Sequence, residues 1–191
     1  MRIPVVAVLA LSLLACTQDQ AAGPSSKALE PPVVAADQAP APAADAAGPA
    51  KAYTVDFPTL DLPTLAGGRY VLAEQRGKWV VVNFWATWCA PCIKEMPELS
   101  AMHAMRSNVA VVGLAYEDTS ADALRSFLEE RPVTYPIVIA DPYDPPADFA
   151  TPRGLPMTYL LDPAGKVVHQ FLGPITAADI EAKITELGGT P

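Results

Sequence analysis

The sequence predicts an α/β domain with a mixed central sheet flanked by helices, and three observations support this fold class. Short apolar, β-branched runs alternate with segments whose apolar residues recur every three to four positions. Two strand-like runs near the C-terminus are joined by turn residues, which adds an antiparallel pair to a parallel one. The whole pattern is confined to residues 53–191. This length suits one domain.

Each predicted element has its own local signal. Residues 78–85 form a continuous apolar run that is β-branched at its centre, which is typical of a buried strand. Residues 90–106 carry Ile93, Met96 and Leu99 at helical spacing. Further strands are predicted over residues 109–115, 135–140, 157–161 and 167–172, and further helices over residues 120–130 and 176–187.

The last two strands and the last helix have the clearest boundaries. The tetrapeptide Asp162-Pro163-Ala164-Gly165 separates the two strands and predicts the turn of an antiparallel hairpin. Thr176 is suited to cap the final helix at its N-terminus, and Gly188 stands just past its end.

Composition excludes two broad classes of function. The chain has 191 residues, of which 51% are apolar and 18% charged, and its net charge is −8. Residues 53–191 contain 10 basic and 17 acidic side chains, so the acidity belongs to the domain. This balance is the opposite of a nucleic-acid-binding footprint. Two histidines and three cysteines are too few for a closed Cys/His zinc site beside any other use of the thiols, so we expect no metal.

The N-terminus has the features of an export signal. Residues 1–15 carry Arg2 and then an uncharged apolar run that is too short to span a bilayer. The run ends in Leu13-Leu14-Ala15-Cys16, which resembles the lipobox of bacterial lipoproteins. That resemblance implies cleavage before Cys16, its lipidation, and anchoring to a membrane of the cell envelope with the protein facing the periplasm. Thr17 favours the outer membrane. The alternative is an ordinary signal peptide that ends at a chance cysteine.

Residues 16–52 connect this signal to the domain. After the cysteine they consist mainly of Ala, Pro, Ser, Gln and Gly with scattered charges and no apolar period. Such a segment cannot bury a core, so we expect a disordered tether.

The two remaining cysteines are the candidate reactive groups. Cys89 and Cys92 directly follow the first predicted strand and open the next helix, with Pro91 in its first turn. A thiolate at a helix N-terminus faces unpaired backbone N–H groups and the positive end of the helix dipole, which lowers its pKa. We expect Cys89 to be the exposed attacking thiolate and Cys92 the shielded resolving thiol. The alternatives are a purely structural disulfide, a metal site completed by the two histidines, and a chance spacing.

The stretch VVNFWATWCAPCIKEMPEL, which contains this pair, resembles the TlpA/ResA/CcmG-type proteins. The resemblance covers nearly all of residues 55–190 and implies a thioredoxin-like fold on an exported, membrane-tethered protein. It also implies thiol–disulfide oxidoreductase activity through the Cys89–Cys92 pair, with no cofactor beyond that redox-active disulfide.

The resemblance assigns roles to residues outside the dithiol. It implies a cis peptide bond between Leu155 and Pro156, where backbone groups pair with a client segment beside Trp88. Met157 stands where relatives have a small hydroxyl residue, so we expect a more apolar groove. Glu117 aligns with an acid that handles the proton of the resolving thiol.

Two other titratable residues are expected to have ordinary roles. Glu95 matches the family motif and is interpreted as structural. His103 is interpreted as a helix-surface residue.

The sequence therefore predicts a monomeric extracytoplasmic reductant of protein disulfides. Its clients would be proteins of cytochrome c maturation or other exported thiol proteins, and its electrons would come from a membrane donor of the DsbD/CcdA kind. Two alternatives stay open. A peroxide-reducing redoxin would need Thr or Ser three residues before the reactive cysteine, where Ala86 stands. A copper metallochaperone would use the dithiol as a soft ligand pair.

Overall fold

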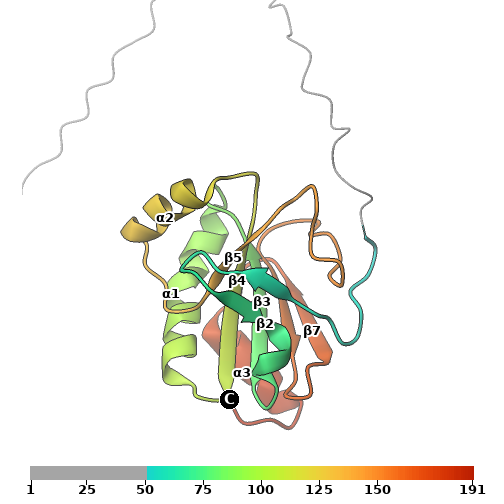
Figure 1. Ribbon diagram of the computed structural model, residues 1–191. Helices are drawn as coiled ribbons and strands as arrows, with labels where there is room; N and C mark the ends of the chain where they lie inside the picture. The colour runs from blue at the N-terminus through green and yellow to red at the C-terminus, as the bar shows by residue number, and fades with distance from the viewer. Residues whose placement is uncertain (1–50) are drawn as a thin grey trace, which may run out of the picture. The chain divides into compact units, whose positions relative to one another are not determined.

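The computed structural model describes residues 51–191 (Figure 1). The predicted signal peptide, Cys16 and all but the last two residues of the predicted tether lie outside this range. The strands are β1 (Asp61–Pro63), β2 (Arg69–Val71), β3 (Trp79–Trp85), β4 (Val109–Tyr116), β5 (Ile137–Ala140), β6 (Met157–Leu161) and β7 (Val167–Leu172). The helices are the short 3₁₀ helix η1 (Leu72–Gln75), α1 (Ala90–Met105), α2 (Ala121–Glu130) and α3 (Ala177–Glu186).

The central sheet is mixed, as predicted. Its strand order is β5-β4-β3-β6-β7. Strand β4 runs parallel to both β3 and β5, whereas β6 runs antiparallel to β3 and β7. The hairpin of β6 and β7 has the predicted bounds. Helices α2 and α3 begin one residue later than predicted because Ser120 and Thr176 act as their N-caps, each accepting a hydrogen bond from a backbone N–H of the first turn.

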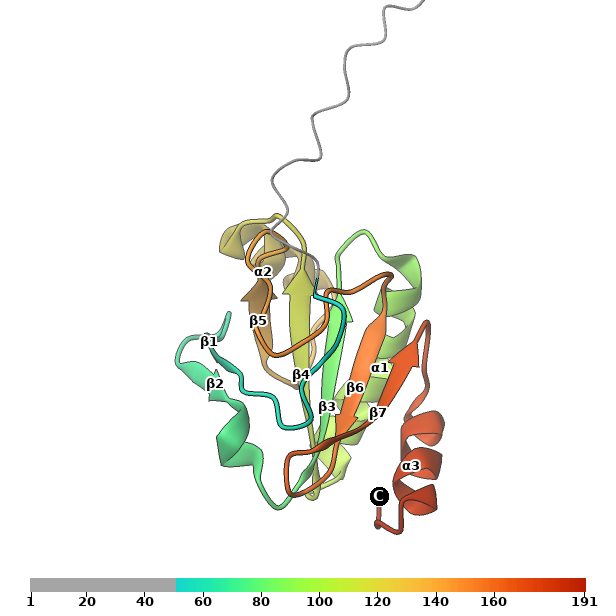
Figure 2. The same cartoon turned by 90° about the vertical axis from the view of Figure 1, so that its right-hand side faces the viewer.

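Each face of the sheet covers a separate apolar cluster. Side chains of α1, α2 and α3 pack on one face against Trp85, Val81 and their neighbours. The other face holds Phe84 and Tyr159, and it is covered by β1, β2, η1 and the loop that contains Phe149. Figure 2 shows the β1–β2 hairpin and α3 on opposite sides of the sheet. The sheet is thus buried on both faces, which explains the continuous apolar runs of its central strands.

The sequence analysis did not predict β1, β2 or η1. Each of the two strands has only three residues, too few for a periodic signal. Gly67 and Gly68 have φ angles of 99° and 78°, the left-handed region that a tight turn between β1 and β2 requires. The N–H of Leu65 donates to the carbonyl of Ile137, at 2.8 Å, and this bond covers the outer edge of β5.

The expectation for His103 is wrong. Its Nδ1 accepts a hydrogen bond from the N–H of Val111 at 3.1 Å, which ties α1 to β4. Burial lowers the pKa of its imidazole, with a smaller effect from Lys78. His103 is therefore a packing contact between helix and sheet.

Strand directions bring four chain segments to one edge of the sheet. The C-terminal ends of β3, β4 and β5 meet there because these strands are parallel. Strand β6 begins at the same edge, since Met157 pairs with Phe84 near the end of β3. The segment after β3 holds the cysteines, and the segment before β6 holds Pro156. No helix within residues 51–191 is long and apolar enough to cross a membrane.

Gly113 offers a test of the packing between this sheet and its helices. A Cβ atom there would lie 2.6 Å from Ile137 Cδ1, 2.9 Å from Trp85 Nε1 and 3.0 Å from Tyr135 Cε2. Gly113→Ala should therefore lower the free energy of unfolding by ~1–3 kcal/mol, measured by guanidinium denaturation. Gly154→Ala is the matched control, because its nearest contact would be 3.9 Å away. Equal midpoints for Gly113→Ala and the unsubstituted protein would contradict this account.

Candidate active site

Cys89 and Cys92 form a disulfide at the N-terminus of α1, with 5.3 Å between their Cα atoms. Cys89 is the N-cap residue, and its Sγ accepts a hydrogen bond from the N–H of Cys92 at 3.3 Å. Pro91 lies in the first turn, where its missing N–H leaves no intrahelical bond unmade. The sulfur of Cys89 therefore faces the N–H groups and positive dipole end that stabilise a thiolate.

The exposure of the two cysteines differs from the expectation in one respect. Cys92 is fully buried, as expected, but Cys89 is only 4% exposed in the disulfide and belongs to the apolar cluster under α1. The expectation of an exposed Cys89 is therefore wrong for this form, since its sulfur is turned back toward the helix. The exposed residue of the motif is Trp88, at 69%.

A groove of about 390 Å³ begins at Trp88. One side is formed by Trp88 and by Tyr116, Glu117 and Asp118 at the end of β4. The other side is formed by residues of the loop between β5 and β6, namely Pro142, Pro152, Arg153, Gly154 and Leu155. The peptide bond between Leu155 and Pro156 is cis. The structure thus brings together the predicted residues Trp88, Leu155 and Glu117 along one surface.

Met157 does not contribute to this groove. Residues that pair across two strands share a face of the sheet, and Met157 pairs with Phe84, which lies on the face away from α1. Its side chain is 2% exposed, and its Sδ lies 3.1 Å from Gln170 Nε2, which donates to it. The expectation of a more apolar groove at Met157 is therefore wrong. Its neighbour Thr158 lies on the α1 face instead.

Glu117 holds the loop that precedes the cysteines. Its Oε1 accepts from the N–H of Thr87 at 2.7 Å, and its Oε2 accepts from the Thr87 hydroxyl at 2.9 Å. Both carboxylate oxygens are therefore engaged with one residue, two positions before Cys89. This arrangement orients the loop, and the proton-handling role of Glu117 stays a prediction.

The buried carboxyl group nearest to Cys92 in the helix is that of Glu95. It lies one turn further along α1, so the two side chains share a helix face. Glu95 is 4% exposed, and its Oε1 accepts from Asn83 Nδ2 at 2.7 Å while its Oε2 accepts from the N–H of Ile175 at 3.1 Å. Burial raises its pKa to about 7, against the opposing effect of these two hydrogen bonds.

The sequence motif predicts a structural role for Glu95, and its raised pKa was not predicted. A signal was present, because Glu95 falls on the apolar stripe that also contains Cys92, Met96 and Leu99. A carboxylate within such a stripe has to be buried, and burial disfavours its charged form.

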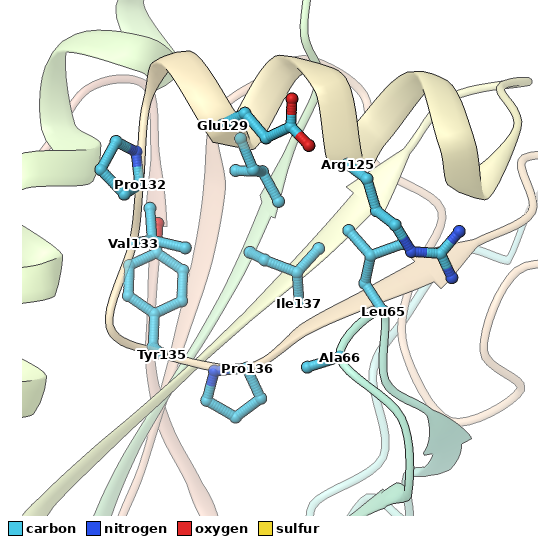
Figure 3. Close-up of a pocket in the computed structure, with 10 residues that line it drawn as sticks. Leu65, Ala66, Arg125, Glu129, Pro132, Val133, Tyr135, Pro136 and Ile137 are labelled. Carbon is cyan, nitrogen blue, oxygen red and sulfur yellow. The ribbon is translucent and has the colours of Figure 1, made fainter.

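A larger cavity lies away from this chemistry. It has a volume of about 500 Å³ and is lined by Leu65, Tyr135, Ile137 and other mostly apolar side chains, with Arg125 and Glu129 of α2 at its border (Figure 3). No cysteine lines it. Within residues 51–191 no cluster of three or more His, Cys, Asp or Glu side chains could hold a metal ion. Thiol chemistry in the described part of the chain is therefore confined to the N-terminus of α1.

Comparisons with known proteins agree with this geometry. The model of the AhpC/TSA family matches residues 54–178. The thioredoxin-like protein YneN of Bacillus subtilis is 34% identical over 130 residues, covering 66% of this chain and 75% of YneN. The thiol-disulfide oxidoreductase ResA of Geobacillus kaustophilus is 34% identical over 131 residues, covering 68% of this chain and 75% of ResA.

Solved structures show the same fold. The crystal structure of a DsbF homologue from Corynebacterium diphtheriae superposes with a TM-score of 0.59 at 27% identity, covering 73% of this chain and 94% of that one. These similarities confirm the resemblance drawn from the motif and the thioredoxin-like fold that it implied. Because the family model spans most of the chain and the two curated relatives are matched over three quarters of their lengths, the protein belongs to the AhpC/TSA family, as a thioredoxin-like member similar to ResA and YneN.

Proposed function

We propose that the protein is an extracytoplasmic thiol–disulfide oxidoreductase that reduces protein disulfides through Cys89 and Cys92. The observation that supports this most directly is the disulfide at the N-terminus of a helix packed on the sheet, beside a groove with an exposed tryptophan. The names of the relatives, thiol-disulfide oxidoreductase among them, support the same reaction.

The reaction proceeds by two thiol–disulfide exchanges. In the reduced protein the Cys89 thiolate attacks one sulfur of a client disulfide, and the other client sulfur leaves as a thiolate and takes a proton. Cys92 then loses its proton and attacks the Cys89 sulfur of the mixed disulfide. The second client thiol is released and the Cys89–Cys92 bond forms. The client gains two electrons and two protons. The protein loses two electrons and the Cys92 proton, and the other proton comes from solvent, which received it when Cys89 ionised.

The proton of Cys92 needs an acceptor near the helix. Glu95 is suited to this step because it is buried on the same helix face and its pKa of about 7 lies near neutrality. Glu117, the acid that the family resemblance assigned, has both oxygens bound to Thr87. We therefore propose Glu95 as the proton acceptor and Glu117 as the residue that orients the loop.

The direction and setting of the reaction follow from chemistry and from the N-terminal sequence. Exported compartments are oxidising, so a tethered protein of this kind is most useful there as a dedicated reductant. It would receive electrons from a membrane donor of the DsbD/CcdA kind and would act on clients of cytochrome c maturation or on other exported thiol proteins. Lipidated Cys16 would hold it to an envelope membrane.

Insulin reduction by the full-length protein tests the proposed reaction. Cys89→Ser should abolish turnover, because it removes the attacking sulfur. Cys92→Ser should instead accumulate a covalent mixed disulfide with insulin, visible on a non-reducing gel. Cys16→Ser is the matched cysteine control and should keep the unsubstituted rate in detergent. Turnover that survives in Cys89→Ser would refute the assignment.

Glu95→Gln tests the proton acceptor. The attack of Cys92 on the mixed disulfide between Cys89 and the client should slow by roughly 10- to 100-fold above neutral pH, because glutamine cannot take the Cys92 proton. Stopped-flow measurement across pH 5–9, with Glu117→Gln in parallel, separates the two carboxylates. A pH profile altered by Glu117→Gln and not by Glu95→Gln would return the role to Glu117.

The same variant has a consequence for stability. The pKa of Glu95 is raised from 4.5 to about 7, so the unfolded state ionises first as the pH increases. Its contribution to stability is therefore present below about pH 4.5 and is lost as the pH rises through about 7, a loss on the order of 1–3 kcal/mol. Glu95→Gln should remove this loss from the pH dependence of denaturant unfolding. A pH profile identical to that of the unsubstituted protein would contradict the raised pKa.

Membrane attachment is tested separately in cells. Cys16→Ser should move the protein from the membrane fraction to the soluble exported fraction, because the acyl chains have no attachment site. Fractionation followed by immunoblotting measures this. A Cys16→Ser protein that stays with the membranes would refute lipid anchoring at this residue.

A further inference from the structure

The loop between β5 and β6 forms one wall of the groove, and the start of the domain holds this loop in place. We call residues 141–154 the wall loop and residues 51–59 the strap. Prolines recur along the wall loop, whereas its inward-facing Phe149 is 1% exposed and packs between Phe84 and Tyr159. Phe149 fixes the middle of the loop, but the groove-lining residues Pro152, Arg153 and Gly154 come three or more positions later.

Hydrogen bonds from the strap fix the part of the wall loop next to Phe149. Asp148 Oδ2 accepts from both the N–H of Thr59, at 2.8 Å, and its hydroxyl, at 2.6 Å. The N–H of Val55 donates to the Asp148 carbonyl at 3.0 Å. The two bonds from Thr59, above all that from its side chain, lower the pKa of the Asp148 carboxyl, so the charged form is the one that holds the strap.

Two further contacts extend the pairing toward the groove. The N–H of Ala150 donates to the Thr54 hydroxyl at 2.8 Å. Lys51 and Thr151 pair in both directions, with the N–H of Lys51 donating to Thr151 Oγ1 at 3.0 Å and the N–H of Thr151 donating to the Lys51 carbonyl at 3.2 Å. Three residues separate Thr151 from Leu155, so the pairing with the strap reaches close to the residues that line the groove.

The strap itself is fixed to the domain. The carbonyl of Asp56 accepts from the N–H of Val167, at the start of β7, at 2.8 Å. Directly after the strap, Leu60 is 4% exposed and belongs to the apolar cluster on the face away from α1. The strap therefore connects the wall loop to the sheet through direct contacts.

The wall loop carries the basic side chain of the groove. Arg153 lines it from the loop, and Glu117 and Asp118 line it from the end of β4. Within residues 51–191 Arg153 forms no salt bridge. The position of the wall loop thus sets the separation between one basic and two acidic groups that a bound polypeptide would meet.

We propose that the strap is a positioning element of the groove, with Asp148 as its fastening residue, and that reduction of protein disulfides depends on it whereas reduction of small disulfides does not. The proposal rests on the proposed function. A protein client contacts the groove on both sides of its disulfide, so it is sensitive to the wall. A small disulfide needs only access to the sulfur of Cys89.

Steady-state kinetics of the full-length protein test this dependence. Asp148→Ala and Thr54→Val each remove a strap contact, and Glu186→Ala, which removes an exposed carboxylate paired with Lys183 on α3, is the charge-matched control. For insulin, kcat/KM should fall by ~3- to 10-fold in the two strap variants, mainly through KM. Asp148→Asn should recover much of the loss, because its amide oxygen still accepts from Thr59. With oxidised glutathione, and in the rate of Cys89 alkylation, all variants should match the unsubstituted protein.

Hydrogen–deuterium exchange provides a second readout that does not need activity. In Asp148→Ala the amides of Ala150 and Thr151, which donate to Thr54 and Lys51, should exchange faster, while those of β3 keep their protection. Unchanged exchange at Ala150 and Thr151 would overturn the proposal, and so would insulin and glutathione rates that fall together. If the unsubstituted protein reduces neither substrate, the proposed function fails, and the exchange data still decide whether the strap positions the groove wall.

Discussion

The geometry of the site depends on the pairing of one strand, β3, whose seven residues are all buried. Parallel pairing with β4 on one side and antiparallel pairing with β6 on the other makes the end of β3 meet the end of β4 and the beginning of β6. The chain passes from β3 through a three-residue loop to Cys89, the N-cap of α1, and it enters β6 directly from Pro156. Two segments separated by more than sixty residues are thereby held at one edge by backbone hydrogen bonds of the core.

A second set of contacts links the chemistry to that core. Asn83, on β3, donates through one Nδ2 to both Glu95 and Thr158, which joins α1 and β6 across the face of the sheet. Glu95 also accepts from the N–H of Ile175, which precedes α3. Burial of a carboxylate without partners would cost free energy, and the two hydrogen-bond donors offset that cost. The pKa of Glu95 stays near neutral pH, so the group can exchange a proton there. The same residue therefore contributes to packing and to the proposed reaction.

The sequence was sufficient for the elements whose signals are local. The hairpin turn at residues 162–165 and the helix cap Thr176 were predicted from their residue types, and the motif around Cys89 identified the family. The sheet face on which the Met157 side chain lies could not be predicted. It depends on how β6 is aligned with its neighbouring strands, because a shift of one residue moves every side chain to the opposite face. The burial of Glu95 was signalled by its place on the apolar stripe of α1, but its partners could not be predicted, because Asn83 and the N–H of Ile175 reach it from other elements of the fold. The β1–β2 hairpin could not be predicted, because its short strands carry no periodic signal and are stabilised by tertiary contacts.

The unequal exposure of the three tryptophans also has an optical consequence. Trp79 and Trp85 are 7% and 0% exposed, whereas Trp88 is 69% exposed and adjoins Cys89 in the chain. A solvated indole emits at longer wavelength than a buried one, and a neighbouring disulfide quenches indole fluorescence on contact. The long-wavelength part of the emission therefore reports on the sulfur chemistry beside Trp88. The domain carries its own spectroscopic label at the place where electrons are exchanged.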